Sequence, residues 1–382
     1  MNTEEPFKRL EQYLEKEEYK GYDPYDTLNS FIPFKLLGKW GPILAIQFQK
    51  RNPVNIRPLI GIKKEINPKA FGLFLQAYSI LYHKTQQKIY FEKAEYFYNW
   101  LNTNYSAGYS GKCWGYNFAW ASPQKYMKPN IPSAVVTGFV VKGLFEFYKI
   151  SQKKEVLDLI VSACRFLDID LEKYSDETGL SISYTPIQKD VCYNASLLAA
   201  EAFAKLYSIN KNEAYKDIAI KAVEFVIRRQ KESGSWNYSV DLNSNKERVQ
   251  IDFHQGYILE SLFEIKNSLM INNEQWENAI KKGLTFYKER QFHDNGRSYW
   301  RIPKDYPVDI HNQAQGIITF NKLDEYSEEY SSFAESISNW TVENMQSAKG
   351  YFYYQVFKTH IHKITYMRWS QAWMFLAFAN LK

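Results

Sequence analysis

The sequence predicts an all-α protein, an (α/α)6 toroid (six-hairpin barrel) with short β-hairpins in the loops at one rim. The first observation is a repeat of about 60 residues. Each unit opens an apolar helix with a polar residue and a small one: Lys69-Ala70, Ser133-Ala134, Asn194-Ala195, Gln255-Gly256, Gln313-Ala314 and Gln371-Ala372. The successive spacings are 64, 61, 61, 58 and 58 residues, so six units account for most of the chain.

The second observation is that two kinds of helix alternate. Helices of the first kind are apolar nearly all round, as in SAVVTGFVVKGLFEFY from Ser133, which predicts burial on every side. Helices between them have one apolar stripe, such as Tyr90, Ala94, Phe97 and Leu101. This alternation predicts an inner and an outer ring. An open helical solenoid is the alternative, but six units with fully buried inner helices favour a closed ring.

The ends of the chain complete the predicted ring. A helix near residues 33–51 is expected to supply the sixth outer member and to pack beside the last inner helix, which runs to Leu381. The predicted organisation is therefore an N-terminal helix and arm over residues 1–32 and a toroid over residues 33–382. The stretch GYDPYD at 21–26 is interpreted as a turn with capping aspartates, and whether it reaches the active rim is left open.

The third observation concerns the long links from outer to inner helices. Each carries a glycine followed by aromatic residues, which predicts short extended pieces or hairpins. These glycines are Gly111, Gly234, Gly296 and Gly350, with Gly179 a weaker example. Because successive helices alternate in direction, the long links all emerge at one rim, where the inner helices begin.

Composition and charge exclude several classes of function. The net charge of +6 is spread along the chain, and its longest basic cluster, at 228–231, gives no nucleic-acid patch. No apolar run approaches the length of a membrane span, and the N-terminal stretch lacks the apolar region of a secretory signal. Three widely spaced cysteines give neither a disulfide framework nor a zinc pair. We therefore expect a cytoplasmic protein without a metal or other cofactor, whose mildly basic surface favours an anionic substrate.

Two similar motifs, Asp252-x-His254 and Asp309-x-His311, lie where a rim loop enters an inner helix. The repeat alone can explain them, because aspartate is a favoured N-cap and either histidine could bond at a helix start. The motifs are 57 residues apart whereas the glutamines opening the two helices are 58 apart, a one-residue slip. The first turns of the six inner helices nevertheless converge on one opening of the ring, which we call the mouth. We therefore predict that Asp252, His254, Asp309, His311 and Arg368 are catalytic residues there.

The aromatic share of 17%, with 30 Tyr and 10 Trp, exceeds what a core needs and suits a partly polar ligand. Flat apolar faces beside hydroxyl and indole donors fit sugar rings. The predicted substrate-binding residues are Arg57, Trp114, Tyr116, Tyr184, Tyr193, Asn194, Trp236, Tyr238, Trp300, Gln313, Tyr353 and Gln371. The alternatives are that the aromatics pack the loops and that Arg57 and Arg368 form rim salt bridges.

Three chemistries remain open at this stage. Hydrolysis would use Asp252 and Asp309 on either side of a glycosidic bond. Elimination or C5-epimerisation of a uronic acid requires a group that neutralises its carboxylate and a group that moves the C5 proton. The candidates for neutralisation are Arg368, Asn194 and Gln313; those for proton transfer are Tyr184, Tyr193, His254 and His311. A metal site from the two motifs lacks tight ligand spacing.

Several stretches carry a family resemblance: GYDPYDTLNS, NIRPLIGIKKEINPKA, CWGYNFAW, PNIPSAVVTGF, VCYNASLLAA, DFHQGYILESL, DIHNQAQGIITF and YMRWSQAWMFLAFA. They resemble an uncharacterised family associated with gene clusters for surface polysaccharides, capsular or lipopolysaccharide, over nearly the whole chain. The resemblance implies an α/α toroid that helps to make or modify an extracellular glycan. The wider similarity is to six-hairpin glycosidases, polysaccharide lyases and the toroid domains of glucuronyl C5-epimerases, although none of their full catalytic signatures maps residue by residue.

The functional hypothesis is a carbohydrate-active enzyme of surface-polysaccharide biosynthesis. Its substrate would be a glycan or lipid-linked saccharide bearing a uronic acid, processed by epimerase, lyase or glycoside hydrolase chemistry. The alternative is a non-catalytic glycan-binding or scaffold subunit of a polysaccharide assembly complex, in contact with the assembly proteins. The sequence leaves the sugar, the linkage, the choice of reaction and the oligomeric state open.

Overall fold

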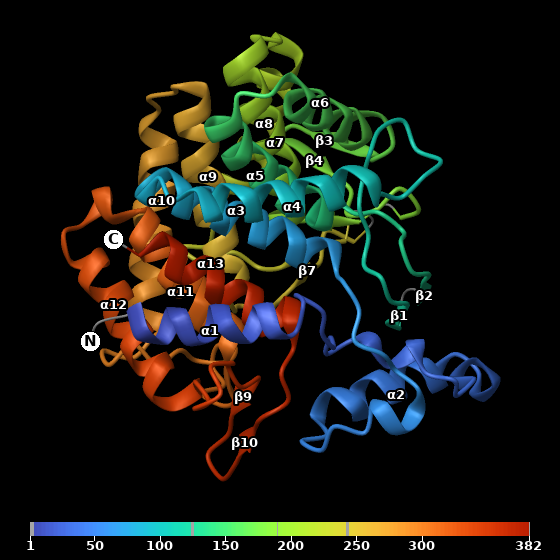
Figure 1. Cartoon of the computed structure of the whole chain (residues 1–382). Helices are drawn as coiled ribbons and strands as arrows, with labels where there is room; N and C mark the ends of the chain where they lie inside the picture. Colours follow the sequence, from blue (N-terminus) through green and yellow to red (C-terminus); the bar gives the residue numbers. More distant parts are fainter. Residues whose placement is uncertain (1–3, 124–125, 189, 242–243, 382) are drawn as a thin grey trace.

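Six helices form an inner ring in the computed structural model, which describes residues 4–123, 126–188, 190–241 and 244–381 (Figure 1). They are α3 (Pro68–Thr85), α5 (Ala134–Ser151), α7 (Tyr193–Asn210), α9 (His254–Leu269), α11 (Ile310–Lys322) and α13 (Ala372–Asn380). Each packs on the next, and α13 packs on both α11 and α3, which closes the ring. The predicted (α/α)6 toroid is confirmed.

The outer ring alternates with the inner one along the chain. Its members are α1 (Glu4–Lys16), α4 (Lys88–Thr103), α6 (Lys154–Ile169), α8 (Glu213–Ile227), α10 (Glu274–Gln291) and α12 (Glu329–Met345). These helices bury one stripe each, for example Ala94, Phe97 and Leu101 in α4. The one-sided pattern predicted for them is thus observed.

The sixth outer helix is α1, and the prediction that residues 33–51 supply it is wrong. Phe7 of α1 stacks on Phe375 of α13, with ring centroids 5.1 Å apart. Gln346, which follows α12, donates to the carbonyl oxygen of Pro6 at 2.8 Å, and Lys93 of α4 pairs with Glu15. The reason is that α1 buries Pro6, Leu10 and Leu14, which are four residues apart and form one apolar stripe that packs in the sixth outer position.

The segment after α1 instead forms a small helical unit at the rim. It contains η1 (Asp26–Asn29), η2 (Phe34–Leu37), α2 (Trp40–Arg51) and η3 (Pro58–Ile60). Helix α2 contacts η1, η2 and strand β1, and Figure 1 shows it in blue apart from the helices of the toroid. Whether residues 1–32 form a unit separate from the toroid stays a prediction.

Short antiparallel strands join the rim loops, as the glycine–aromatic pattern predicts. Their bounds are β1 (Trp120–Ala121), β2 (Tyr126–Met127), β3 (Lys173–Asp176), β4 (Gly179–Ile182), β5 (Val191–Cys192), β6 (Ser239–Val240), β7 (Glu247–Arg248), β8 (Val308–Asp309), β9 (Gln355–Val356) and β10 (Ile361–His362). The sheets β5–β6–β7 and β8–β9–β10 connect loops of successive units. In the second, Asp309 lies opposite Gln355.

All five glycines of the long links touch the next outer helix, and all of them except Gly111 have positive φ. Gly234 has φ +96°, and a Cβ there would lie 2.3 Å from the carbonyl oxygen of Lys282 in α10. Gly296 has φ +85°, and a Cβ there would lie 2.6 Å from the amide nitrogen of Ile337 in α12. Both conditions require glycine, which accounts for the recurring glycine in the sequence.

In the last three units, the glutamine that opens the inner helix holds the rim loop before it. Gln371 accepts from the amide nitrogen of Phe352 at 2.9 Å and donates to its carbonyl oxygen at 2.8 Å. Gln255 makes the same pair of bonds with Trp236, at 2.8 and 2.7 Å. Gln313 accepts from Ser298 and donates to Gly296. In these three units the repeated glutamine therefore attaches the loop to the helix.

We expect Gln371→Ala to lower the free energy of unfolding by about 1–3 kcal/mol, because it leaves two buried backbone groups of Phe352 unpaired. Urea denaturation measures this. Gln87→Ala, at an exposed position without a side-chain cap bond, is the control and should change stability by less than about 0.5 kcal/mol. Equal stabilities of the two variants would contradict the proposed attachment.

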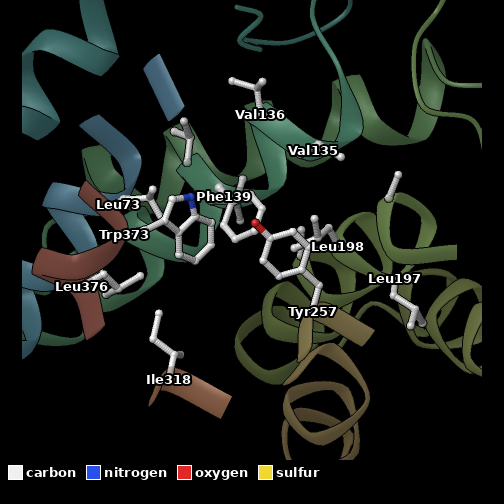
Figure 2. Packing of buried hydrophobic residues seen from close by; sticks show 14 of the residues in the cluster. Leu73, Val135, Val136, Phe139, Leu197, Leu198, Tyr257, Ile318, Trp373 and Leu376 are labelled. Atoms are coloured by element: carbon white, nitrogen blue, oxygen red, sulfur yellow. The ribbon is translucent and has the colours of Figure 1, made fainter. Parts of the chain in front are cut away.

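Aromatic side chains close the centre of the toroid below the rim. Figure 2 shows Phe139, Tyr257 and Trp373 meeting there, with aliphatic residues such as Leu198 and Ile318 around them. Tyr257 stacks on Trp373 at 5.4 Å, and Phe139 lies edge-on to both, at 5.2 and 5.1 Å. We call Phe139, Tyr257 and Trp373 the aromatic floor. It forms the base of the candidate site.

Candidate active site

A ring of side chains surrounds the mouth where the inner helices begin. It consists of Tyr116, Tyr184, Tyr238, Phe253, His254, Arg368 and Trp369, and we call it the mouth ring. Within the mouth ring, Cζ of Arg368 lies 4.9 Å from the ring centroid of Tyr116 and 5.2 Å from that of Trp369. The hydroxyl of Tyr184 hydrogen-bonds to Tyr116. Residues from distant parts of the sequence thus meet at one place, as the repeat predicts.

Five members of the mouth ring are partly exposed: Tyr116, Tyr184, Tyr238, Phe253 and His254. The mouth ring is therefore partly open to solvent. Tyr116, Tyr184 and Tyr238 are among the residues predicted to bind a substrate, and the structure brings them together. Their hydroxyl groups are protonated at neutral pH, since burial raises the pKa of each.

His254, the first residue of α9, is held by a carboxylate. Its Nδ1 lies 2.5 Å from Oδ1 of Asp252, whose Oδ2 accepts from Gln250 at 2.9 Å and lies 3.3 Å from Nε of Arg301. Burial raises the pKa of Asp252, but His254 and Arg301 more than offset this and leave it below its usual value. The imidazole is 14% exposed, and its Nε2 has no hydrogen-bond partner among the described residues. This arrangement suits a general base.

His311 lies deeper than His254, on the other face of Phe253. Each imidazole stacks on Phe253 with centroids 4.2 Å apart, and two rings cannot share one face at that distance. Nε2 of His311 makes a short hydrogen bond with the hydroxyl of Tyr257. Burial first, and then Lys69 and Arg368, lower the pKa of His311 well below its usual value, so the imidazole is neutral.

The buried His311 predicts a pH dependence of stability. The unfolded chain protonates this residue below about pH 6.5, whereas the folded chain does so only at a much lower pH. The free energy of unfolding therefore falls as the pH drops from about 6.5, by about 1.4 kcal/mol per pH unit from this residue. Urea denaturation at several pH values should show that the free energy of unfolding of His311→Asn changes less steeply with pH than that of the wild type. His362, whose pKa burial lowers to about 4, is present in both proteins, so equal slopes would contradict the prediction.

Asp309, predicted to be catalytic, accepts hydrogen bonds from the protein through both of its carboxylate oxygens. It is the N-cap of α11, and its Oδ1 accepts from the amide nitrogen of His311 at 3.0 Å and from Nε1 of Trp369 at 2.9 Å. Its Oδ2 accepts from Nε2 of Gln355 at 2.7 Å. Burial raises its pKa. The side chain thus ties the helix start to β9 and to the mouth ring.

The GYDPYD stretch reaches the mouth, which answers the question left open by the sequence. Asp23 accepts two bonds from Arg368, at 2.6 and 2.8 Å, and Asp26 pairs with Arg57 at 2.7 Å. Asp23 also accepts from the amide of Tyr25, as expected for a capped turn. The guanidinium of Arg57 is fully buried. These pairs are the rim salt bridges that the sequence left as an alternative.

Sequence reasoning missed Lys69 as a member of the site. Its Nζ lies 4.1 Å from the ring centroid of Phe139, 5.2 Å from that of Trp373 and 5.5 Å from that of Tyr257. The residue is 3% exposed, and its amine has no hydrogen bond or ion pair within the described ranges. Burial first, and then Arg368, lower its pKa well below the usual value. The available signal was a lysine at the repeat position where four of the other five units have an amide.

Asp23 and Tyr25 were also missed. The ring of Tyr25 lies 5.7 Å from that of Trp369, and its hydroxyl accepts from Nζ of Lys50 at 2.6 Å. No repeat position marks these residues, because they come from the segment before the first inner helix. Their only signal was the pair of aspartates in GYDPYD.

Other predicted substrate-binding residues lie in the packing of the loops. Trp114 and Trp236 are buried, and their Nε1 atoms donate to the carbonyl oxygens of Leu101 and Val226, at 3.2 and 2.9 Å. These indoles have no face free for a ligand. The two helix-opening glutamines predicted to bind substrate are occupied by rim loops, as described above.

Four further predicted residues also have partners away from the mouth ring. Tyr193 is buried and donates to Glu247 at 2.6 Å, while Asn194 accepts from the thiol of Cys192 at 3.1 Å. The side chains of Trp300 and Tyr353 are partly exposed in their rim loops, beside Arg301 and Tyr351 respectively. We leave all four out of the proposed site. In the described part of the chain, no group of three His, Cys, Asp or Glu residues is placed to hold a metal ion.

Comparisons with known proteins show the fold. No family model and no curated protein matches the sequence. A cellobiose 2-epimerase from Bacillus thermoamylovorans matches with a TM-score of 0.64 and 17% identity, over 82% of this chain and 87% of that one. A GH76 α-mannanase from Bacteroides thetaiotaomicron matches with 0.62 and 14% identity, over 82% and 85%. An unsaturated glucuronyl hydrolase specific for heparin matches with 0.65 and 12% identity, over 98% and 94%.

Proposed function

We propose that the protein is an enzyme that moves a proton at a carbon atom of a saccharide, in an epimerase or lyase reaction. The observation that carries this proposal is His254, held through Nδ1 by Asp252 with its Nε2 free at the mouth. The mouth ring supports a sugar substrate because it combines aromatic faces with hydroxyl groups. Fold neighbours whose names describe a sugar epimerase, a mannanase and a glucuronyl hydrolase support the same class of substrate.

The reaction begins at a carbon next to the carbonyl or carboxylate group of the sugar. Nε2 of His254 accepts the proton from this carbon, and the electron pair moves onto the adjacent oxygen. The carboxylate of Asp252 stabilises the imidazolium that forms. As the electron pair returns from the oxygen to the carbon, the hydroxyl of Tyr257, bonded to His311, donates a proton to the opposite face of that carbon and gives the epimer. The imidazolium of His254 then releases its proton to water and Tyr257 regains one from water, which restores both side chains. If a substituent leaves the neighbouring carbon instead, the product is unsaturated.

Glycoside hydrolysis has less support from the structure. It requires one carboxyl group that donates a proton to the leaving oxygen and a second that acts on water or on the sugar. The carboxylates of Asp23, Asp252 and Asp309 all accept hydrogen bonds from the protein through both oxygens. We therefore favour proton transfer at carbon.

A carboxylate on the sugar, as in a uronic acid, would suit Lys69. Its amine is buried against the aromatic floor without a counter-ion among the described residues, and a nearby anion would favour its charged form. Arg368 is already neutralised by Asp23, so Lys69 takes the role predicted for that arginine. A place in surface-polysaccharide synthesis, a cytoplasmic location and contact with assembly proteins stay predictions.

Incubation of the protein in D2O with uronic-acid oligosaccharides and with neutral aldoses tests this proposal. We expect deuterium at C5 of the uronic acid by NMR, with or without an unsaturated product. Deuterium exchange that occurs only at C2 of the neutral sugars would support proton transfer at carbon but refute the uronic-acid substrate. New reducing ends without exchange or an unsaturated product would indicate a hydrolase, and binding without change would indicate a glycan-binding subunit.

A further inference from the structure

Residues 31–64 expose more large apolar side chains than any other part of the described chain. We call these residues the rim segment. Eight of the 17 exposed large hydrophobic residues among the described residues lie here, each 57% to 83% exposed. They are Phe31, Leu36, Leu37, Trp40, Leu44, Phe48, Val54 and Leu59. Figure 1 shows the rim segment in blue beside the toroid, close to strands β1 and β2. An apolar surface of this kind marks a site of interaction.

The exposed residues of α2 form one stripe. Trp40, Leu44 and Phe48 recur every four residues and therefore lie on the same face of the helix. The opposite face packs against the protein, where Ile43 and Ile46 are buried. Helix α2 is thus attached on one side and leaves an apolar stripe uncovered on the other.

The charge of the rim segment has one sign. No aspartate or glutamate occurs between Asp26 and Glu65, whereas seven Lys and Arg residues do. Arg57 pairs with Asp26, and Lys64 pairs with Glu17. The remaining five are Lys35, Lys39, Lys50, Arg51 and Lys63, and in the described part of the structure none pairs with a carboxylate. Of these, all but Lys50 are exposed.

We propose that the rim segment binds the surface of a lipid bilayer that contains anionic phospholipids. The stripe of Trp40, Leu44 and Phe48 would enter the boundary between headgroups and acyl chains, and the basic side chains would meet the phosphates. A second copy of the chain fits less well, because a symmetric contact would bring two basic segments together without acidic partners. Within the described residues no helix is long and apolar enough to cross a membrane, so α2 would lie along the surface.

The packed side of α2 borders the candidate site. Nζ of Lys50 donates to the hydroxyl of Tyr25 at 2.6 Å, and the ring of Tyr25 contacts Trp369 of the mouth ring. Attachment of the rim segment would therefore bring the mouth close to the membrane surface. If the proposed function holds, this position suits a saccharide carried on a lipid. Membrane binding itself does not depend on that function.

Vesicle flotation of the full chain, without any sugar, tests the proposal. We expect the protein to float with vesicles of phosphatidylcholine and phosphatidylglycerol, less with phosphatidylcholine alone, and less at high salt. The variant Trp40→Ser/Leu44→Ser/Phe48→Ser should bind at least about tenfold more weakly. The variant Lys35→Glu/Lys39→Glu should lose the preference for anionic vesicles.

The matched control is Ile89→Ser/Ile169→Ser/Met270→Ser, which removes three exposed apolar side chains elsewhere on the surface. It should float like the wild-type protein, and circular dichroism should show all variants folded. Absence of wild-type flotation, or an equal loss in the control, would overturn the proposal. Light scattering that shows a dimer broken by the α2 variant, without vesicle binding, would assign the stripe to a second copy.

Discussion

Replacing His254 by alanine is expected to lower kcat for the proposed proton transfer by about 10²- to 10⁴-fold, the usual contribution of a general base. Its Nε2 is unbonded at the mouth, and Nδ1 is held by Asp252, so among the described residues the imidazole has no hydrogen-bond partner beyond that carboxylate. Asp252→Asn should lower kcat in the same direction, because it removes the charge that stabilises the imidazolium. Deuterium exchange into the sugar measures both effects, and the thermal midpoint of His254→Ala should stay near that of the wild type.

The chain offers a matched control in His293. Its Nε2 lies 2.9 Å from Asp305, and its ring stacks on Tyr299 at 4.4 Å, in a rim loop outside the mouth ring. His293→Ala therefore breaks a histidine–aspartate pair of the same kind without touching the site and should retain activity. Full turnover by His254→Ala would refute the assigned role, and loss of turnover in both variants would attribute the effect to the rim loops.

The largest expected effect on stability comes from Asp23→Ala. Arg368 is 3% exposed, and its guanidinium donates two bonds to this carboxylate. Burial lowers the pKa of Arg368, but Asp23 more than offsets this, so the arginine remains charged. Removal of its partner leaves a buried charge uncompensated, and the free energy of unfolding should fall by about 3–5 kcal/mol in urea denaturation. The pair also joins the N-terminal segment to the start of the last inner helix.

Two further variants separate this explanation from a general loss of packing. Asp23→Ala combined with Arg368→Met removes both charges and should recover much of the lost stability. Glu4→Ala breaks the exposed pair with Lys8, whose contribution is at most about 1 kcal/mol. If Asp23→Ala were no more destabilising than Glu4→Ala, the pair would not hold the segment in place.

The convergence of distant residues at one mouth was predictable, but the direction of each side chain was not. The one-residue slip between the two Asp-x-His motifs shows why. His254 directly precedes its loop-binding glutamine, whereas His311 stands two places before its own. One residue turns a helix by about 100°. The first imidazole therefore reaches the mouth, and the second lies under Phe253 beside the aromatic floor.

The assignment of the outer ring failed for a related reason. Both α1 and α2 carry apolar residues, and the sequence places α2 nearer to the first inner helix. The stripe of α1 is narrow and matches the gap between α12 and α4, whereas α2 has apolar residues on two faces. Which helix completes the outer ring depends on how its apolar face fits against α12 and α4. A local sequence pattern does not contain that information.

The six units, the alternation of fully and half-buried helices, and the rim at which the inner helices begin were all predictable from the sequence. These properties follow from the periodicity of apolar residues, which the chain repeats in every unit. Three features of the site became visible only in the folded chain: Asp23 neutralises Arg368, Asp309 accepts bonds through both oxygens, and Lys69 is buried without a counter-ion among the described residues. Those features depend on contacts between residues as many as 345 positions apart in the sequence. Such residues can pair their charges and hydrogen bonds only once the ring of helices has closed.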